Sequence, residues 1–277
     1  MVVDIQALRE NFKAPHHLIT TSDKQILFLR QWKSKKSDNK NTAILILHGI
    51  TAYSGPYEMI AIPLTELGFN VYGLDLRGHG LSDGNRGDSP SMERYSKDLC
   101  ESIEFVRQLH PKVVLLGHSL GVLSSMIVLN NCLEKIDGAA LLSGARVTRP
   151  GVYPAMSAFQ KLKILFIHLI RPSKQVIRHY RDGMVGLDDP LFNFNYTFRF
   201  MRIVGLRDFV FPELGNMPFF VAVGDNDELF SVESCRELYD EIPSTNKMFH
   251  IAVGGRHAEF PEGSMAPLGP WLDEQFD

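Results

Sequence analysis

From Ala43 to Leu142 the sequence alternates short apolar runs with longer segments of helical periodicity, and this alternation constrains the fold more than any other feature. The apolar runs, which we expect to be buried strands, are Ala43–Leu47, Val71–Leu74, Val113–Leu116 and Ala139–Leu142. The segments between them, which we expect to be helices, are Tyr57–Leu67, Met92–Leu109 and Leu120–Leu133. Such alternation is typical of β-α-β units, so the sequence predicts a mostly parallel central sheet with helices on both faces.

Both flanks of this region extend the pattern. Upstream, His17–Thr20 and Ile26–Trp32 enclose a Thr-Ser-Asp-Lys turn, which predicts an antiparallel hairpin at the sheet edge. Downstream, a strand, a helix and a strand are expected at Pro218–Val223, Val232–Glu241 and Lys247–Val253. We therefore expect one α/β domain in two parts, residues 1–145 and 217–277, with an insertion at residues 146–216.

The insertion is expected to be mainly helical. It holds an apolar stretch from Phe159 to Ile170 and an aromatic-rich stretch from Phe192 to Phe200. These residues could form a subdomain that buries them against itself and the main core. They could instead form a cap whose underside lines an acyl-binding pocket and whose rim contacts a membrane or micelle surface. The two alternatives can hold for different faces of the insertion.

Composition excludes several classes of protein. The net charge of −3 lacks the basic footprint of a nucleic-acid-binding protein, so no nucleic acid is expected as a partner. The three cysteines Cys100, Cys132 and Cys235 fit neither a disulfide framework nor a C-x-x-C motif, so we expect reduced thiols in the core. The N-terminal residues do not resemble a signal peptide and no apolar run is long enough to span a membrane, so we expect a cytoplasmic protein.

Gly117–Gly121 matches the pattern G-x-S-x-G, in which a serine lies on a tight turn between a strand and a helix. The required context is present, because the expected strand Val113–Leu116 precedes Ser119 and the expected helix Leu120–Leu133 follows it. In that geometry the hydroxyl lies above the carboxyl end of the sheet, and the helix N-terminus stabilises an oxyanion. The motif therefore predicts Ser119 as a nucleophile rather than a helix-capping serine.

A serine nucleophile needs a base, and the base needs an orienting carboxylate. In this motif's fold they follow in the order Ser, Asp or Glu, His. Among the ten histidines only His257 lies just after the last expected strand, Lys247–Val253, which predicts it as the general base. Asp225 and Asp227 both follow the strand Pro218–Val223, so position alone leaves either as the acid and the other as a turn-former.

An oxyanion hole needs one N–H from the residue after the nucleophile and one from the loop after an early strand. These criteria predict the backbone amides of Leu120 and Ile50, the latter following His48-Gly49. No second cluster of His, Cys or Asp at ligand spacing accompanies His48, so neither a metal nor a cofactor is expected.

With these motifs the chain resembles the monoglyceride lipase and lysophospholipase branch of the α/β-hydrolases, which is also grouped under the serine aminopeptidase S33 label. The resemblance spans nearly the whole chain outside the insertion. It rests on four blocks: HGITAYSGPY at residues 48–57, DLRGHGLSDG at residues 75–84, Gly117–Gly121, and Gly224–Asp227 with His257. One departure is the elbow itself, which reads GHSLGV where many relatives have GHSMGG, so that Val122 adds bulk at the start of the helix.

The resemblance implies an α/β-hydrolase fold with an inserted cap and a serine esterase of lipid metabolism that works through an acyl-enzyme. It also implies Asp227 as the catalytic acid, because the acid of that branch occupies the fourth position of a G-x-x-D turn. Residues 75–84 are expected to be structural and to brace their loop through hydrogen bonds. The expected substrates are small-molecule esters or lipids such as monoacylglycerols or lysophospholipids.

Other functions remain open on the same catalytic residues: a short-chain carboxylesterase, a thioesterase or an S33-type peptidase. A non-catalytic lipid-binding module is a more distant alternative. A cap lined with carboxylates would favour the peptidase, whereas this insertion is rich in basic residues, namely Arg171, Lys174, Arg178 and Arg181. A basic rim fits anionic head groups or fatty acids better, although scattered charges ordinarily form a solvated face. The sequence does not indicate an oligomeric state.

Overall fold

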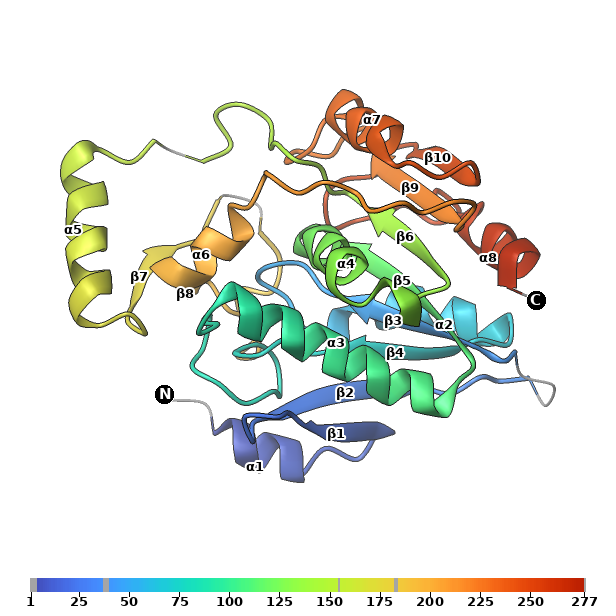
Figure 1. The fold of residues 1–277 in the computed structure, drawn as a ribbon, viewed down its shortest axis with the longest axis horizontal. Helices are drawn as coiled ribbons and strands as arrows, with labels where there is room; N and C mark the ends of the chain where they lie inside the picture. The colour runs from blue at the N-terminus through green and yellow to red at the C-terminus, as the bar shows by residue number, and fades with distance from the viewer. Residues whose placement is uncertain (1–3, 37–39, 154, 182–183, 277) are drawn as a thin grey trace.

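The computed structural model describes residues 4–36, 40–153, 155–181 and 184–276. Its central sheet comprises β1 (His16–Thr20), β2 (Ile26–Trp32), β3 (Thr42–Leu47), β4 (Asn70–Leu74), β5 (Lys112–His118), β6 (Gly138–Leu142), β9 (Phe219–Gly224) and β10 (Lys247–Ala252). The strands lie in the order β1-β2-β4-β3-β5-β6-β9-β10 (Figure 1). The pairs β1–β2 and β2–β4 are antiparallel and the other neighbours are parallel. The predicted mostly parallel sheet with an antiparallel hairpin at one edge is confirmed.

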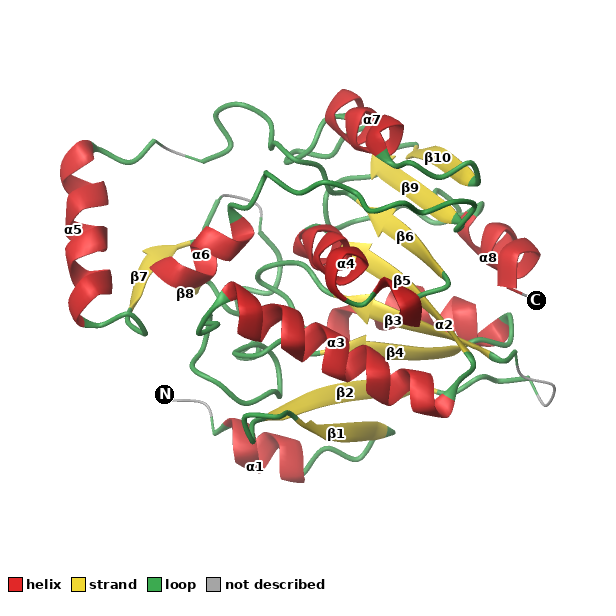
Figure 2. Ribbon diagram, in the orientation of Figure 1, coloured by secondary structure: helices red, strands yellow, loops and turns green. Residues whose placement is uncertain are grey.

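Helices cover both faces of this sheet (Figure 2). One face packs against α3 (Met92–Leu109), α4 (Leu120–Asn131) and α7 (Val232–Glu241), and the other against α2 (Glu58–Glu66) and α8 (Leu268–Phe276). Successive residues of a strand point to opposite faces, so Leu45 and Leu115 join the first core while Ile44 and Val114 join the second. The central strands are therefore apolar throughout, which is why short apolar runs located them. The remaining core elements are α1 (Ile5–Glu10) and two 3₁₀ turns, Gly55–Tyr57 and Leu133–Lys135.

A disulfide joins the two helices on the nucleophile's side of the sheet. Cys100 of α3 is bonded to Cys132, which caps the C-terminus of α4, and their Cα atoms are 6.1 Å apart. The expectation of reduced thiols was wrong for these two residues, and only Cys235 is a free, buried thiol. Packing of α3 against α4 brings together two cysteines that are 32 positions apart in the sequence. Their spacing along the chain could not predict this contact.

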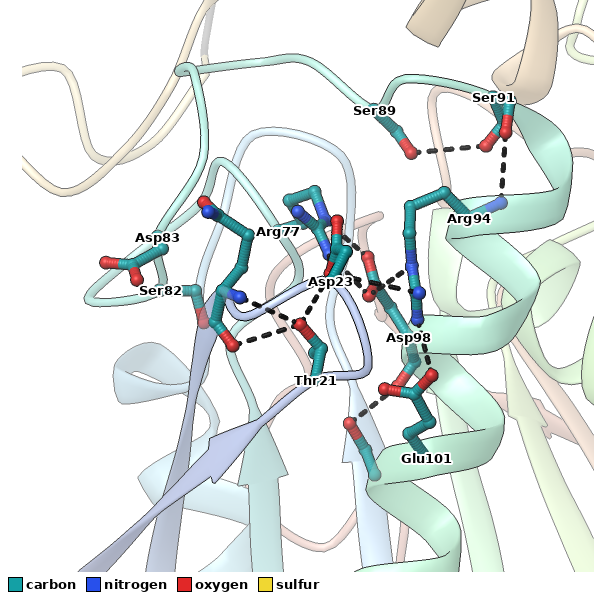
Figure 3. A network of polar contacts seen from close by, with 12 residues as sticks. Thr21, Asp23, Arg77, Ser82, Asp83, Ser89, Ser91, Arg94, Asp98 and Glu101 are labelled. Atoms are coloured by element: carbon teal, nitrogen blue, oxygen red, sulfur yellow. Dashed lines mark hydrogen bonds and ion pairs between the residues drawn. The ribbon is translucent and has the colours of Figure 1, made fainter.

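The loop after β4 is held by a network of ion pairs (Figure 3). The buried Arg77 guanidinium lies 2.6 Å from Asp98 of α3 and 2.8 Å from Asp23 in the β1–β2 turn. Arg94 of α3 extends the network to Asp98 and Glu101, at 3.0 and 2.8 Å. These contacts join the hairpin, the loop and α3, so the structural interpretation of residues 75–84 is confirmed.

The chain between β6 and β9, residues 143–218, is referred to below as the inserted segment. It contains α5 (Ala158–Ile170), α6 (Phe198–Val204) and an antiparallel pair of short strands, β7 (Gln175–Arg178) and β8 (Asn195–Thr197). The sequence did not predict this pair. Tyr196 and Phe200 are fully buried, whereas α5 has no buried side chain and stands apart from the main body at the left of Figure 1. Within the described ranges, no helix combines the length and apolar character that crossing a membrane requires.

Candidate active site

Ser119 lies at the junction of β5 and α4 with a backbone φ of 55° and ψ of −112°. A positive φ is unfavourable for a residue with a side chain, so the surrounding packing must impose it. A Cβ on Gly117 would lie 2.3 Å from the carbonyl oxygen of Gly121, and one on Gly121 would lie 1.9 Å from that of Leu47. The two glycines of G-x-S-x-G therefore permit α4 to approach β5 and β3, and this close approach holds the serine in its turn.

Three residues predicted from the sequence meet at this turn. Nε2 of His257, in the loop after β10, lies 3.0 Å from Oγ of Ser119. Nδ1 of His257 lies 3.0 Å from Oδ2 of Asp227, in the loop after β9. Because an ionised carboxylate only accepts hydrogen bonds, Nδ1 carries the proton and Nε2 is left to accept from the Ser119 hydroxyl.

The structure separates the two candidate acids. Asp227 is buried, and its second carboxylate oxygen accepts from the amides of Leu229 and Phe230 at 2.8 and 2.9 Å. Burial acts to raise the pKa of the Asp227 carboxyl, but the bond to His257 and the two amides outweigh it, so this pKa lies below its ordinary value. Asp225 is exposed, and its carboxylate accepts from the amide of Gly254, in the loop after β10, at 2.7 Å. This bond joins two loops, whereas a turn-former bonds a nearby amide of its own turn.

The two amides predicted for an oxyanion hole line the same cavity as Ser119 and His257. The orientation of the Gly49–Ile50 peptide is fixed by its carbonyl oxygen, which accepts from Nδ1 of His48 at 2.8 Å and from the amide of Ala52 at 3.1 Å. Since C=O and N–H point in opposite directions across a trans peptide, these contacts also aim the Ile50 N–H. Among the described residues, neither the Ile50 nor the Leu120 N–H donates a hydrogen bond, so both are available to a ligand.

Sequence reasoning missed a chain of hydrogen bonds that connects the loop after β3 to His257. Nε2 of His118 lies 2.7 Å from the backbone oxygen of His257 and must donate to it, which leaves Nδ1 to accept from the Tyr57 hydroxyl at 2.8 Å. That hydroxyl accepts from the amide of Gly49 at 2.8 Å. Burial lowers the pKa of His118 to about 4, which keeps the ring neutral for this pairing. The position of His118 beside Ser119 in the motif was the one available signal, since its contacts are all distant in sequence.

Ser119 lines a cavity of about 660 Å³ that lies between the core and the inserted segment. Most of its lining side chains are apolar, including Val122 and Leu229 of the core and Met184, Met201 and Phe209 of the inserted segment. Its charged lining residues, within the described ranges, are four arginines, Arg146, Arg178, Arg181 and Arg207. In those ranges no group of three or more His, Cys, Asp or Glu is arranged to hold a metal ion.

Comparisons with known proteins agree with this architecture. Rat monoglyceride lipase is 26% identical over 266 residues, which cover 90% of this chain and 85% of the relative. An uncharacterised abhydrolase domain-containing protein of Dictyostelium discoideum is 26% identical over 283 residues, which cover 94% of this chain but 29% of that longer protein. The present chain thus spans less than a third of the length of the Dictyostelium relative.

The crystal structure of a soluble variant of monoglyceride lipase from Saccharomyces cerevisiae, in complex with a substrate analog, is similar with a TM-score of 0.76 at 14% identity. The similarity covers 96% of this chain and 94% of the yeast one, and it confirms the predicted α/β-hydrolase fold. Residues 38–263 match the model of the family described as serine aminopeptidase, S33, which is well over half of the sequence. The chain therefore belongs to the serine aminopeptidase S33 family of α/β-hydrolases.

Proposed function

We propose that this protein hydrolyses carboxylic esters through Ser119, His257 and Asp227, and that its substrates are monoacyl lipids. The observation that carries the proposal is a hydrogen-bonded array at a largely apolar cavity, in which His257 Nε2 lies 3.0 Å from Ser119 Oγ and His257 Nδ1 lies 3.0 Å from Asp227 Oδ2. The rat relative, which is named monoglyceride lipase, supports the same activity.

Acylation begins when His257 takes the Ser119 proton on Nε2 while Oγ attacks the acyl carbonyl carbon. The negative charge that develops on the carbonyl oxygen is stabilised by the N–H groups of Ile50 and Leu120. Asp227 holds the imidazole in the required tautomer and stabilises the imidazolium. The C–O bond then breaks, and His257 donates its proton to the departing alcohol.

Deacylation repeats these steps with water as the nucleophile. His257 takes a proton from water, the hydroxide oxygen attacks the acyl carbon, and the same two amides stabilise the oxyanion. Collapse of the intermediate releases a carboxylic acid and returns the proton to Ser119. No step requires a cofactor or a metal, because the positioned residues supply the nucleophile, the base and the oxyanion donors.

The cavity favours an acyl chain as part of the substrate. Its volume of about 660 Å³ lies in the range of sites that enclose small molecules, and its apolar lining matches a hydrocarbon chain. We assign residues 146–216 the role of a cap, since α6 and the strand β7 contribute Met201 and Ile177 to the cavity wall. Monoacylglycerols and lysophospholipids both combine one chain with one ester in this way.

The family's label also raises the possibility of a peptidase that recognises an N-terminal amine. An ammonium group bound in an apolar cavity needs a carboxylate partner. The described residues that line this cavity include no Asp or Glu. This lining supports an ester substrate over a peptide with a free N-terminus.

The cap is further proposed to contact lipid surfaces through α5. Phe159, Phe166 and Leu169 of this helix are 75%, 62% and 73% exposed, and the helix carries Lys161 and Lys163 but no acidic residue. An apolar helix with basic side chains is suited to an anionic membrane surface. We expect the protein to sediment with phosphatidylglycerol vesicles and the double variant Phe166→Ser, Leu169→Ser to remain in the supernatant; equal sedimentation of both would contradict this contact.

The hydrolase proposal is tested by labelling and turnover. A fluorophosphonate probe should label the wild type but not Ser119→Ala, while Ser125→Ala, a change at a buried serine of α4 outside the cavity lining, should label normally. The rate with glycerol and p-nitrophenyl esters should rise from acetyl to longer chains and fall at least about 10⁴-fold in Ser119→Ala. Labelling that survives in Ser119→Ala would overturn the assignment of the nucleophile, and turnover confined to acetyl and butyryl esters would overturn the lipid substrate.

A further inference from the structure

The Ile50 N–H can stabilise an oxyanion only if the backbone on both sides of it is held in place. The peptide on its N-terminal side is fixed, because the Gly49 carbonyl oxygen accepts from His48 and Ala52. On its C-terminal side lies the carbonyl of Ile50 itself, in the loop after β3. No backbone N–H of the described residues donates to this carbonyl oxygen, so side chains must hold it.

Two buried side chains do so, one from the core and one from the inserted segment. The Tyr196 hydroxyl, from β8, donates to the Ile50 oxygen at 2.7 Å. Nε2 of His79, in the loop after β4, lies 3.0 Å from the same oxygen. Neither side chain is accessible to solvent. The loop that carries the proposed oxyanion donor is therefore held from both regions of the molecule.

His79 alone cannot fix the Ile50 carbonyl in every state of its ring. Its Nδ1 lies 3.0 Å from the backbone oxygen of Arg77, so both ring nitrogens face carbonyl oxygens. Burial holds the pKa of His79 well below its ordinary value, and the neutral ring carries one N–H for two acceptors. When that proton is on Nδ1, the Nε2 lone pair faces the Ile50 oxygen, and of the two side chains only Tyr196 can donate to it.

The Tyr196 hydroxyl keeps its proton, because burial raises the pKa of Tyr196 well above its ordinary value. The hydroxyl also contacts the backbone oxygen of Asn193, so its proton is shared between two carbonyl oxygens. A hydroxyl and a carbonyl oxygen that lie 2.7 Å apart are joined by a proton. Tyr196 is therefore a donor to Ile50 whichever nitrogen of His79 is protonated.

The chain next to Tyr196 holds the following peptide of the same loop. The amide of Asn193 donates to the backbone oxygen of Thr51 at 2.9 Å. The Tyr196 ring itself stacks on Phe200 of α6, with ring centroids 5.4 Å apart, which fixes the direction of its hydroxyl. Residues 193–196 of the inserted segment therefore contact two successive carbonyl oxygens of the loop after β3.

We propose that Tyr196 is a positioning residue for the oxyanion hole: its hydroxyl holds the carbonyl of Ile50 and thereby keeps the N–H of Ile50 directed at the oxyanion. Tyr196 does not line the cavity, so it acts through the backbone of the loop and not through contact with the substrate. The inserted segment thus has a role in catalysis besides covering the cavity. This inference rests on the proposed ester hydrolysis and adds a positioning residue to it.

Tyr196→Phe is the test variant, because it removes the hydroxyl and retains the buried ring. Tyr72→Phe is its matched control. Tyr72 of β4 is 1% exposed and does not line the cavity, and its hydroxyl bonds the side chains of Gln31 and His110 at 3.0 and 2.9 Å. Both variants lose one buried hydroxyl, so a difference between them in catalysis reports the contact with Ile50.

For p-nitrophenyl decanoate we expect Tyr196→Phe to lower kcat about tenfold and to change KM less than about twofold. Loss of a whole oxyanion donor costs about 10²–10³ in kcat, and a donor that is present but poorly aimed costs a part of this. KM changes little because the full negative charge develops on the carbonyl oxygen only after attack. Tyr72→Phe should keep the kcat of the wild type. Equal kcat for the two variants, or a loss that lies in KM, overturns the proposal.

A mimic of the oxyanion separates this role from a general disturbance of the cavity. A decyl trifluoromethyl ketone binds when Ser119 Oγ adds to its carbonyl carbon, the Ser119 proton passes to His257, and the ketone oxygen becomes an oxyanion. We expect Tyr196→Phe to weaken this inhibitor about tenfold. The affinity for 1-O-decylglycerol, which has no carbonyl, should stay unchanged. Equal weakening of both ligands, or of neither, overturns the positioning role.

A carbonyl signal in nuclear magnetic resonance tests the contact without any turnover. The dipeptide Ile-Thr occurs twice in the sequence, at residues 19–20 and 50–51. A sample with ¹³C at the carbonyls of isoleucine and ¹⁵N in threonine therefore gives two carbonyl–amide correlations. We expect Tyr196→Phe to shift the Ile50 carbonyl signal, because its oxygen loses a hydrogen bond, and Tyr72→Phe to leave it in place. The Ile19 signal, from β1, shows that each variant is folded.

The two proposals can fail separately. A wild type that turns over no ester contradicts the hydrolase, and a shifted Ile50 signal then still supports the role of Tyr196 in holding the loop. An Ile50 signal that Tyr196→Phe leaves unchanged overturns the inference, in an active enzyme as well. A shifted signal with the kcat of the wild type shows a contact that catalysis does not need, and this also overturns it.

Discussion

The strand β3 and the helix α5 are both rich in large apolar residues, yet they differ completely in how far these residues are buried. All six residues of β3 are buried between the two cores, whereas none of the 13 residues of α5 is buried. The comparison shows that apolar composition alone does not locate the core of this molecule. In β3 the apolar groups are covered by helices on both faces, whereas α5 contacts α6 along one side, where Ile164 and Ile167 are half-buried, and leaves most of its large apolar side chains exposed.

Buried polar groups do not follow this contrast. In the core, the buried carboxylate of Asp75 accepts from the amides of Ser54 and Leu81, at 2.7 and 2.8 Å, which fixes the loops beside the active site. The inserted segment is joined to the core by polar contacts of the same kind: Thr197 and Arg199 both bond Asp88, and the Tyr196 hydroxyl donates to the carbonyl oxygen of Ile50 at 2.7 Å. The contrast between the two regions is therefore one of apolar burial in β3 and α5, and not of polar attachment.

The largest expected effect tests how tightly the core specifies its catalytic acid. Asp227→Asn should lower kcat for a p-nitrophenyl ester by about 10⁴-fold, because an amide at this position no longer holds the His257 tautomer. Asp225→Asn, which alters an exposed turn residue in the same loop, should change kcat less than about threefold. A greater loss from Asp225→Asn would transfer the role of acid to that residue, and circular dichroism of both variants separates lost activity from lost folding.

A second effect, of intermediate size, concerns acid stability and compares buried histidines of the two regions. Burial lowers the pKa of His118 in the core and of His179 in the inserted segment to about 4. A histidine whose pKa is lower in the folded than in the unfolded state contributes fully to stability above pH 6.5. That contribution is lost as the pH falls toward 4, because only the unfolded chain takes up the proton.

For His118 the loss amounts to about 3 kcal/mol across this window. Urea unfolding at pH 7, 6, 5 and 4.5 should show a falling free energy of unfolding, and His118→Gln should reduce the slope. His179→Gln should reduce it as well if the inserted segment unfolds together with the core. A slope that His118→Gln leaves unchanged would contradict burial of the neutral ring, and a slope sensitive only to His118 would show that the two regions unfold separately.

The features that the sequence predicted differ in kind from those that it did not predict. The strands, the elbow at Ser119 and the position of His257 were predictable, because each depends on a local pattern of apolar residues, glycines or chain order. Position alone did not decide between Asp227 and Asp225, because both follow the same strand and they differ in burial and in the bond to His257, which a local pattern does not record. Resemblance to a family favoured Asp227. The Cys100–Cys132 disulfide and the pairing of β7 with β8 depend on contacts between distant segments that no local pattern records.

The smallest expected effect bears most directly on the contrast between the buried central strands and α5. Phe166 of α5 is 62% exposed, so Phe166→Ser should change the free energy of unfolding by less than about 0.5 kcal/mol in urea denaturation. Leu115 of β5 is fully buried, and Leu115→Ala should cost about 2–5 kcal/mol because it leaves a cavity in a packed core. A cost for Phe166→Ser as large as that for Leu115→Ala would mean that α5 packs against protein in solution, and the proposed lipid contact would then lose its basis. A negligible change in stability for Phe166→Ser, together with lost vesicle sedimentation of the double variant Phe166→Ser, Leu169→Ser, would assign the apolar face of α5 to membrane binding. These residues would then contribute nothing to stability and still be required at the lipid surface.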